Sequence, residues 1–207
     1  DIGEFDENKA IQTFEVIESF LVRRALCGHE PTGLHAVFKD LWKNSAGDPT
    51  KVREKVVTKT IIFPTDEMVE DNVLLRPMYS SKIAPFILAE YERSLQGNQV
   101  ESFRVLPVMT IDHVMPQDRS DAWTSVISED AHERLKHTWG NLVPLSQGAN
   151  SSKKSKGWRD TKDLLTGETK FETVKEILKH DVWDEESICT RSKSLSKWAI
   201  GRWPDTF

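Results

Sequence analysis

Cysteine is scarce in this sequence, long hydrophobic runs are missing, and positive charge is not in excess. The two cysteines, Cys27 and Cys189, lie far apart and form no Cys-x-x-Cys pair, which argues against a zinc ribbon or a disulfide scaffold. Such usage is typical of a reducing compartment. No apolar segment is long enough to span a membrane, and the first residues do not show the pattern of a secretory signal. We therefore expect a cytoplasmic protein without a membrane partner.

Also missing is the Gly-x-x-x-x-Gly-Lys motif of many nucleotide hydrolases, so we expect no nucleotide cofactor in this chain. The formal net charge of the 207 residues is −5, and the excess of acidic residues lies mostly in the first half. Such a chain as a whole does not attract a polyanion such as DNA. Any contact with nucleic acid must therefore come from a local basic patch.

The first half of the sequence predicts helices only, over residues 8–27, 34–44, 48–58, 65–75 and 81–95. The first of these helices has an apolar face at helical spacing, made of Ile11, Phe14, Ile17, Leu21 and Ala25. Asp48-Pro49 is a typical helix start, with a capping side chain followed by proline in the first turn. Gly97-Asn98 is the clearest internal break, so we expect a helical region over residues 1–97.

The second half of the sequence mixes strands and helices. Apolar and β-branched residues over 105–114 predict a buried strand, and residues 139–145 predict a second short strand. Further helices are expected after Ser128 and over residues 150–165, where a loop leads into the helix, 171–180 and 185–203. Together these patterns predict an α+β fold that is predominantly helical. A small core of two strands and one helix, with C-terminal helices, would occupy residues 98–207, and the helical region over 1–97 would pack on it.

The residues with the clearest chemistry are Asp112 and His113, at the end of the first predicted strand. Neighbouring side chains on a strand point to opposite faces, so one can bind a metal while the other faces solvent near a substrate. Mg²⁺ takes a few oxygen ligands and keeps several waters, which makes the Asp112 carboxylate and the Asn150 amide oxygen candidate ligands. The imidazole of a solvent-facing His113 can take a proton from water near neutral pH. These residue types favour metal-assisted hydrolysis of a phosphodiester.

Three segments together carry a family resemblance: Asp112-His113-x-x-Pro116-Gln117, then Gly140-Asn141-Leu142-x-x-Leu145, and then Asn150. This pattern resembles the HNH, or ββα-metal, nuclease motif, in the His-Asn-Asn form of the HNH domain of CRISPR effectors. More specifically, the chain resembles the C-terminal nuclease half of GmrSD-type restriction proteins and related phosphorothioate-dependent defence nucleases. Further positions that fit this family are residues 17–24, Trp158, Lys162, Trp183, Ile188 and Arg191.

The resemblance implies a role for each motif residue. Asp112 and Asn150 would be ligands of Mg²⁺ or Mn²⁺, His113 the general base, and Asn141 the motif residue that braces the loop. The implied reaction is the nicking of double-stranded DNA in defence against phage. A nucleotide-hydrolysing sensor domain, absent from this chain, would precede the nuclease and control it. Two other readings stay open: a catalytically inactive HNH fold that binds DNA or a partner, and a nuclease that cleaves RNA.

A basic cluster follows the second candidate metal ligand. Residues 150–162 contain five basic side chains and one acidic side chain, and the basic ones are Lys153, Lys154, Lys156, Arg159 and Lys162. We expect them to contact DNA phosphates, although a merely solvated face is the alternative. Arg23 and Arg24 are the next candidates for DNA contact, or else they pair with nearby acidic residues.

Two histidines and the tryptophans have simpler structural explanations. His132 and His137 are five residues apart, which splits them around a helix axis instead of aligning them as metal ligands. Both are therefore expected at the solvated surface. Most of the seven tryptophans are expected in the core and not as platforms for stacking bases.

Overall fold

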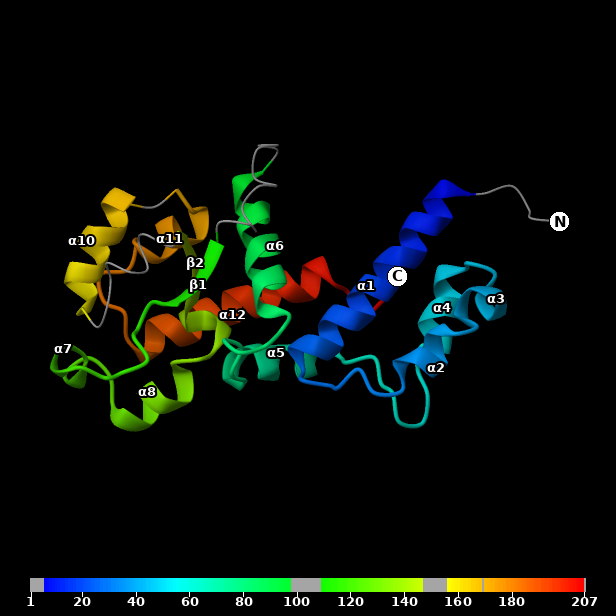
Figure 1. Cartoon of the computed structure of the whole chain (residues 1–207), viewed down its shortest axis with the longest axis horizontal. Helices are drawn as coiled ribbons and strands as arrows, with labels where there is room; N and C mark the ends of the chain where they lie inside the picture. Colours follow the sequence, from blue (N-terminus) through cyan, green and yellow to red (C-terminus); the bar gives the residue numbers. More distant parts are fainter. Residues whose placement is uncertain (1–5, 98–108, 147–155, 169, 207) are drawn as a thin grey trace. The chain divides into compact units, whose positions relative to one another are not determined.

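The structure, a computed structural model, describes residues 6–97, 109–146, 156–168 and 170–206 (Figure 1). The chain forms two compact units. Unit 1 consists of Asp1–Val73 and Ser196–Phe207, and unit 2 of Leu74–Leu195. The fold class is confirmed, because the described residues are predominantly helical and contain a two-stranded antiparallel sheet.

Unit 1 is helical. Its elements are α1 (Glu7–Leu26), α2 (Leu34–Phe38), α3 (Leu41–Ser45), α4 (Pro49–Lys55), most of α5 (Asp66–Leu75) and the end of α12 (Glu185–Arg202). The predicted start at Asp48 is confirmed, since its side chain accepts the backbone N–H of Lys51 at 3.1 Å and Pro49 opens the helix. The helix predicted over residues 34–44 is instead two short ones, α2 and α3. The helices of unit 1 share a small core that includes Val16 and Phe20 of α1 and Val52 of α4.

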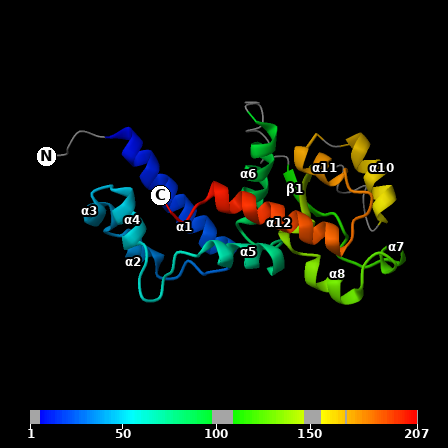
Figure 2. The ribbon, with the colours of Figure 1, turned by 180° about the vertical axis from the view of Figure 1, so that it is seen from behind.

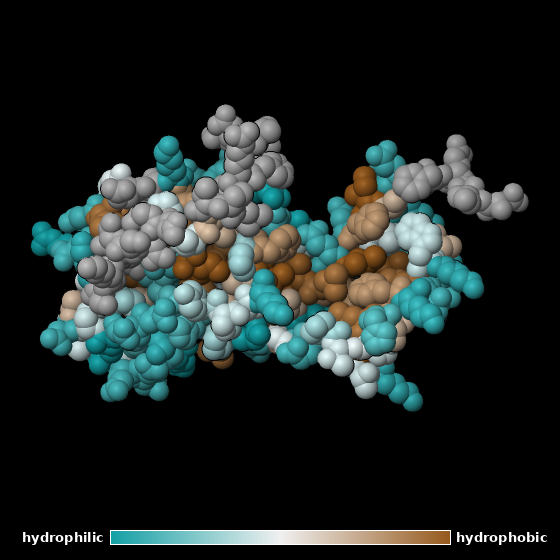
Figure 3. All heavy atoms as spheres, in the orientation of Figure 1, coloured by the Kyte–Doolittle hydropathy of each residue, from teal (hydrophilic) through white to brown (hydrophobic). Residues whose placement is uncertain are grey.

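The buried face of α1 is not the predicted one. Ile11, Phe14 and Leu21 are 48%, 65% and 38% exposed, while Val16 and Phe20 are fully buried. The buried face also holds small and polar residues such as Thr13, whose hydroxyl donates to the carbonyl of Gly47 at 2.7 Å. Apolar periodicity does not register such residues as core. It found the apolar stripe that stays at the surface, where Figure 3 shows hydrophobic side chains over α1.

Arg23 and Arg24 hold unit 1 together and are not available to DNA. The guanidinium of Arg23 is fully buried and donates to the carbonyls of Pro64 (2.8 Å) and Trp203 (2.7 Å), and also to Asp66 (2.6 Å). The guanidinium of Arg24 donates to backbone carbonyls as well. Buried donors committed to carbonyls cannot reach a phosphate, so the alternative DNA contact at these two residues is wrong.

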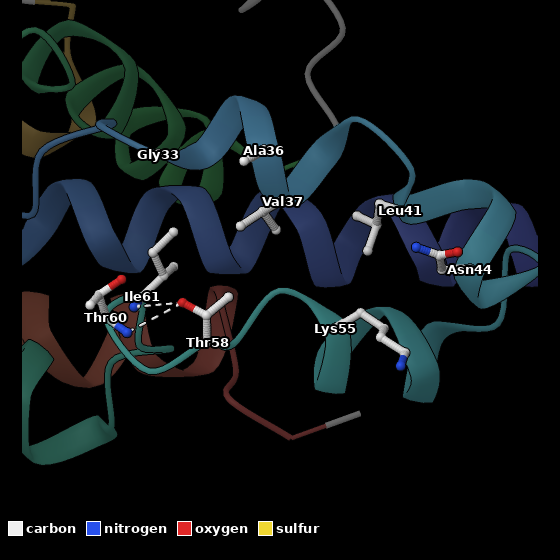
Figure 4. Close-up of a pocket in the computed structure, with 9 residues that line it drawn as sticks. All are labelled: Gly33, Ala36, Val37, Leu41, Asn44, Lys55, Thr58, Thr60 and Ile61. Atoms are coloured by element: carbon white, nitrogen blue, oxygen red, sulfur yellow. Dashed lines mark hydrogen bonds between the residues drawn. The ribbon is translucent and has the colours of Figure 1, made fainter.

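Unit 1 also contains a cavity of about 430 Å³ (Figure 4). Its lining combines apolar side chains from α2 and α3 with the turn that follows α4. That turn is fixed by the Thr58 hydroxyl, which accepts the backbone N–H groups of Thr60 and Ile61 at 3.3 and 3.1 Å. None of the residues that the sequence predicts for the active site lines this cavity.

Unit 2 contains the sheet and the helices that cover it (Figure 2). Its elements are α6 (Ala84–Gln96), β1 (Met109–His113), α7 (Asp121–Thr124), α8 (Glu129–Leu135), the 3₁₀ turn η3 (Trp139–Asn141), β2 (Leu142–Ser146), α10 (Trp158–Glu168), α11 (Glu172–Ile177) and the first part of α12. β1 and β2 are antiparallel, with Asp112 opposite Val143 and His113 opposite Leu142. The second strand starts later than predicted, because residues 139–141 form the 3₁₀ turn.

Tryptophans make much of the core of unit 2. Trp123, Trp158 and Trp183 pack in one cluster with Val143 and Leu145 of β2. The expectation that most tryptophans are buried is confirmed, although Trp42 in unit 1 is 55% exposed. Leu165 of α10 belongs to the same cluster, so β2 and α10 share one core.

Helix α6 belongs to unit 2, although the sequence-based division places it in the region 1–97. A buried carboxylate ties α6 to α11 of unit 2. Glu92 on α6 accepts the backbone N–H groups of Glu172 and Thr173 at 2.7 and 2.8 Å. Glu92 therefore caps the first turn of α11, where four backbone N–H groups need partners. The Tyr91 hydroxyl donates to Glu176 on the same helix at 3.0 Å. Both α6 and α11 contact β2.

Candidate active site

Asp112 and His113 are neighbours on β1, as the sequence predicts, but His113 does not face solvent. Its side chain is only 4% exposed, whereas Asp112 is half-buried. The pairing with Leu142 of β2 places His113 at the last register position of the sheet. The backbone N–H of Val114 then donates to the carbonyl of Asn141 at 2.8 Å, which continues the pairing just beyond the strand end.

His113 lies in a cluster of three rings with His137 and Tyr79. Nε2 of His113 and Nδ1 of His137 are 2.9 Å apart and share a hydrogen bond. The Tyr79 ring covers both imidazoles, with centroids 4.2 Å from His113 and 5.7 Å from His137. Tyr79 is itself 38% exposed. The cluster therefore encloses one edge of His113 and reaches the surface through the tyrosine.

The surface placement predicted for His132 and His137 is wrong. Helix α8 ends at Leu135, so His137 lies beyond the helix and the argument from helical spacing does not apply to it. His137 is half-buried, and its carbonyl accepts the backbone N–H of Met78 at 2.6 Å. His132 is 1% exposed and its Nε2 bonds to the carbonyl of Pro116 at 2.9 Å, which holds the chain that follows β1. A usable sequence signal was the position of His137 two residues before the Trp139-Gly140-Asn141 segment.

Asn141 holds two parts of the chain together through its side chain, which is completely buried. Its Oδ1 accepts the backbone N–H of Met115 at 2.8 Å and the indole N–H of Trp183 at 3.1 Å. Its Nδ2 donates to the carbonyls of Met115 and Lys136, at 2.8 and 2.9 Å. The amide thus ties the segment after β1 to the segment that carries His137.

Arg191 of α12 fixes the same turn from the other side. Its Nη1 donates to two carbonyls of the turn, those of Trp139 (3.3 Å) and Gly140 (2.7 Å), and to the carbonyl of Leu142 at the start of β2 (2.9 Å). Burial lowers the pKa of Arg191 to about 10, against the opposing influence of Tyr91 and Glu176. The guanidinium therefore remains charged at neutral pH, and charged donors make strong hydrogen bonds to carbonyls.

Gly140 lets α12 approach the turn closely enough for these bonds. A Cβ at this position would meet the hydroxyl of Ser192 and would lie 2.7 Å from the carbonyl oxygen of Ile188. The turn and the helix backbone cannot both stay in place with a side chain between them. Glycine is thus required here by close approach, and its φ angle is not in the left-handed region.

We expect Gly140→Ala to destabilise the protein by about 2 kcal/mol or more, because the added methyl overpacks a rigid contact. The control is Gly201→Ala, within α12 itself, where a new Cβ would meet nothing within 4 Å. Alanine is the better helix former, so the control should be neutral or stabilised by about 0.5–1 kcal/mol. Chemical denaturation of the two variants and the wild type measures the difference. Equal stability of both variants would contradict the close approach.

Comparison with known families decides what kind of domain carries this site. The family described as GmrSD restriction endonucleases, C-terminal domain, matches residues 63–198, which is more than half of the chain. The chain belongs to this family. No curated protein and no solved structure matches it. The match includes all of unit 2 and leaves most of unit 1 outside.

Membership of this family identifies the chain as a C-terminal domain of a restriction endonuclease. The substrate class of restriction endonucleases is DNA. Within the described ranges, every helix is too short or too polar to cross a lipid bilayer.

Only one of the two predicted metal ligands of the GmrSD C-terminal domain lies among the described residues. Asn150 lies outside the described residues, and Asp112 on β1 lies inside them. Over the ranges that the structure describes, no group of three or more His, Cys, Asp or Glu side chains could hold a metal. Asp112 is thus the one predicted ligand that the described residues include, and its carboxylate is an oxygen donor of the kind that Mg²⁺ takes.

The basic cluster of the GmrSD C-terminal domain also lies partly inside and partly outside the described residues. Lys153 and Lys154 lie outside the described residues, whereas Lys156 and Arg159 are exposed. Lys162 is engaged within the protein, since its ammonium donates to the carbonyl of His180 at 2.8 Å. Among the described members, Lys156 and Arg159 are therefore the better placed for a phosphate contact.

Proposed function

We propose that this GmrSD C-terminal domain is a metal-dependent HNH endonuclease that nicks double-stranded DNA. The observation that carries the proposal is the fixed position of His113, on the strand residue next to Asp112 and hydrogen-bonded to His137. Asn141 of the family motif supports that position through four side-chain hydrogen bonds.

The proposed reaction is hydrolysis with His113 as general base. His113 takes a proton from water, the resulting hydroxide forms a bond to phosphorus, and the bond from phosphorus to the leaving oxygen breaks. Asp112, together with Asn150, would hold Mg²⁺ or Mn²⁺. When bound, the ion supplies charge stabilisation for the phosphate and for the leaving oxygen. One such site cuts one strand at a time, so nicking is the expected outcome.

The test is incubation of the protein with supercoiled plasmid and Mg²⁺ or Mn²⁺. We expect open circles to form, and we expect an excess of chelator to stop their formation because the ion's charge stabilisation is lost. Asp112→Ala should need much more metal for half-maximal rate, whereas Asp163→Ala, which removes an exposed carboxylate on α10, should titrate like the wild type. Equal metal dependence of wild type and Asp112→Ala would exclude Asp112 as a ligand.

Two other functions are outcomes of the same experiment. Binding of DNA without any cutting, at every metal concentration, would indicate an inactive HNH fold that acts as a binding module. Faster cutting of a matched RNA than of the DNA would indicate an RNA nuclease. The proposal also includes a role in restriction of phage, under the control of a nucleotide-hydrolysing sensor domain.

The basic cluster makes a separate prediction about DNA binding. If Lys153, Lys154 and Lys156 contact phosphates, changing all three to alanine should flatten the dependence of log Kd on log salt. Each lost contact reduces the slope by about one, because fewer condensed counterions are released. Affinity should fall similarly for every DNA sequence, since phosphate contacts position the duplex without reading it.

The matched control for the lysine variant removes the same charge elsewhere. Lys170, Lys175 and Lys179, which are exposed in and around α11, are changed together to alanine. The slope of this control should stay close to that of the wild type. Equal slopes for both triple variants would show that Lys153, Lys154 and Lys156 are a solvated face.

A further inference from the structure

We infer that His137 is a positioning residue for His113, whose ring it holds in the tautomer that a general base needs. The inference rests on the proposed function, in which His113 takes a proton from water. His137 was outside the predicted site and belongs to none of the three motif segments. The structure nevertheless places its Nδ1 at 2.9 Å from Nε2 of His113.

The direction of this hydrogen bond decides whether His113 can be a base. A neutral imidazole has one nitrogen that donates and one that accepts. If Nε2 of His113 donates to His137, the lone pair of His113 is on Nδ1 and can accept a proton. In the opposite arrangement His137 would donate, the lone pair on Nε2 of His113 would be occupied, and the base would be blocked.

The surroundings of His137 allow it to be the acceptor, and the tautomer measurement below decides the direction of the bond. Burial, helped by the nearby ammonium of Lys136 and by His132, lowers the pKa of His137, although Glu133 acts in the opposite direction. A neutral His137 keeps a nitrogen lone pair for the bond. Proton transfer from water to Nδ1 of His113 makes an imidazolium, and its Nε2–H then becomes a charged donor to His137. Charge-assisted hydrogen bonds are shorter and stronger than neutral ones, so this bond gains strength as the reaction proceeds.

The backbone on both sides of His137 is fixed. The carbonyl of Lys136 accepts from the Asn141 amide at 2.9 Å. The carbonyl of His137 itself accepts the N–H groups of Met78 and Tyr79, at 2.6 and 3.3 Å. The Tyr79 ring lies against both imidazoles. Asn141 thus acts on His113 through His137, in addition to holding the segment after β1.

Two variants separate the hydrogen bond from the ring that makes it. His137→Phe keeps a flat ring against Tyr79 and removes the nitrogen, while His137→Asn offers an amide oxygen near the position of Nδ1. We expect His137→Phe to lower kcat for plasmid nicking by about tenfold to a hundredfold, the effect of one strong hydrogen bond. KM for the plasmid should stay within about twofold, because His137 makes no proposed contact with DNA. His137→Asn should recover most of the lost rate.

Long-range ¹H–¹⁵N NMR of the histidine side chains provides a readout that does not depend on cutting. In the wild type, His113 should show a protonated Nε2 and an unprotonated Nδ1, and in His137→Phe the two nitrogens should exchange protons between tautomers. An unchanged His113 spectrum in His137→Phe, or no recovery with His137→Asn, would overturn the inference. A wild-type protein that cuts neither DNA nor RNA would overturn the proposed function alone, because the NMR comparison still decides whether His137 sets the tautomer.

Discussion

Replacing His113 with alanine is expected to lower the rate of plasmid nicking by about a hundredfold to ten-thousandfold, the usual cost of losing a general base. An imidazole is the kind of side chain that can take a proton from water near neutral pH, and water without a base is a poor nucleophile. Binding of DNA should change little, because phosphate contacts are assigned to the basic cluster. Single-turnover nicking and a DNA-binding titration of the same variant measure the two effects separately.

The burial of His113 makes a second variant necessary. The side chain is only 4% exposed and packs against Tyr79, so alanine leaves a cavity and should cost about 1–2 kcal/mol of stability. His113→Gln fills most of the space and can still bond to His137, but its amide takes no proton near neutral pH. We expect it to be nearly as inactive as His113→Ala while unfolding close to the wild type. Nicking by His113→Gln at the wild-type rate would assign the base to another residue.

The second large effect is on stability. Asn141→Ala should destabilise the protein by about 3–5 kcal/mol, because it removes four hydrogen bonds and leaves buried partners unsatisfied. These partners include the backbone groups of Met115 and the indole N–H of Trp183, which have no access to solvent water at the position of the lost amide. The loss is measured by denaturant unfolding.

A matched control for Asn141 is Asn72 on α5. Its amide makes one local hydrogen bond, to the carbonyl of Met68 at 2.8 Å, and it is half-buried. Asn72→Ala should cost about 1 kcal/mol or less. In the fraction of Asn141→Ala that stays folded at low temperature, the metal dependence of nicking should match that of the wild type. A stability loss as small as that of Asn72→Ala would show that Asn141 does not brace the turn.

Sequence periodicity and local start signals predicted the elements well because both depend on residues close in the chain. The capping by Asp48 and by Ser128, which accepts the N–H of Ala131 at 3.2 Å, is visible in the local sequence. The same holds for Asp112 and His113, because a strand that ends in two polar residues can be recognised without knowing its partner. The family motif then added Asn141, whose spacing from His113 is characteristic.

What the sequence did not predict depends on partners far apart in the chain. Arg23 is buried because it bonds to carbonyls 41 and 180 residues later, and no local pattern reveals such acceptors. The prediction that the face with Ile11 and Phe14 is buried was wrong for a related reason. Periodicity finds an apolar face of a helix but does not tell which face packs against the rest of the unit. His137 was missed because a helix was assumed to continue two residues past Leu135, where it ends.

The hydrogen bonds of Arg191 have a consequence for the order in which the site is completed during folding. They join α12 to carbonyls that lie 49 to 52 residues earlier in the chain, on the turn that contains Asn141 and on the first residue of β2. Contacts over such separations form late, because the loop between them must close first. The ribosome synthesises Arg191 well after His113 and the turn, so the turn is fixed by this guanidinium only once α12 has formed and docked. In the proposed function, His113 is therefore oriented for catalysis only after α12 is in place.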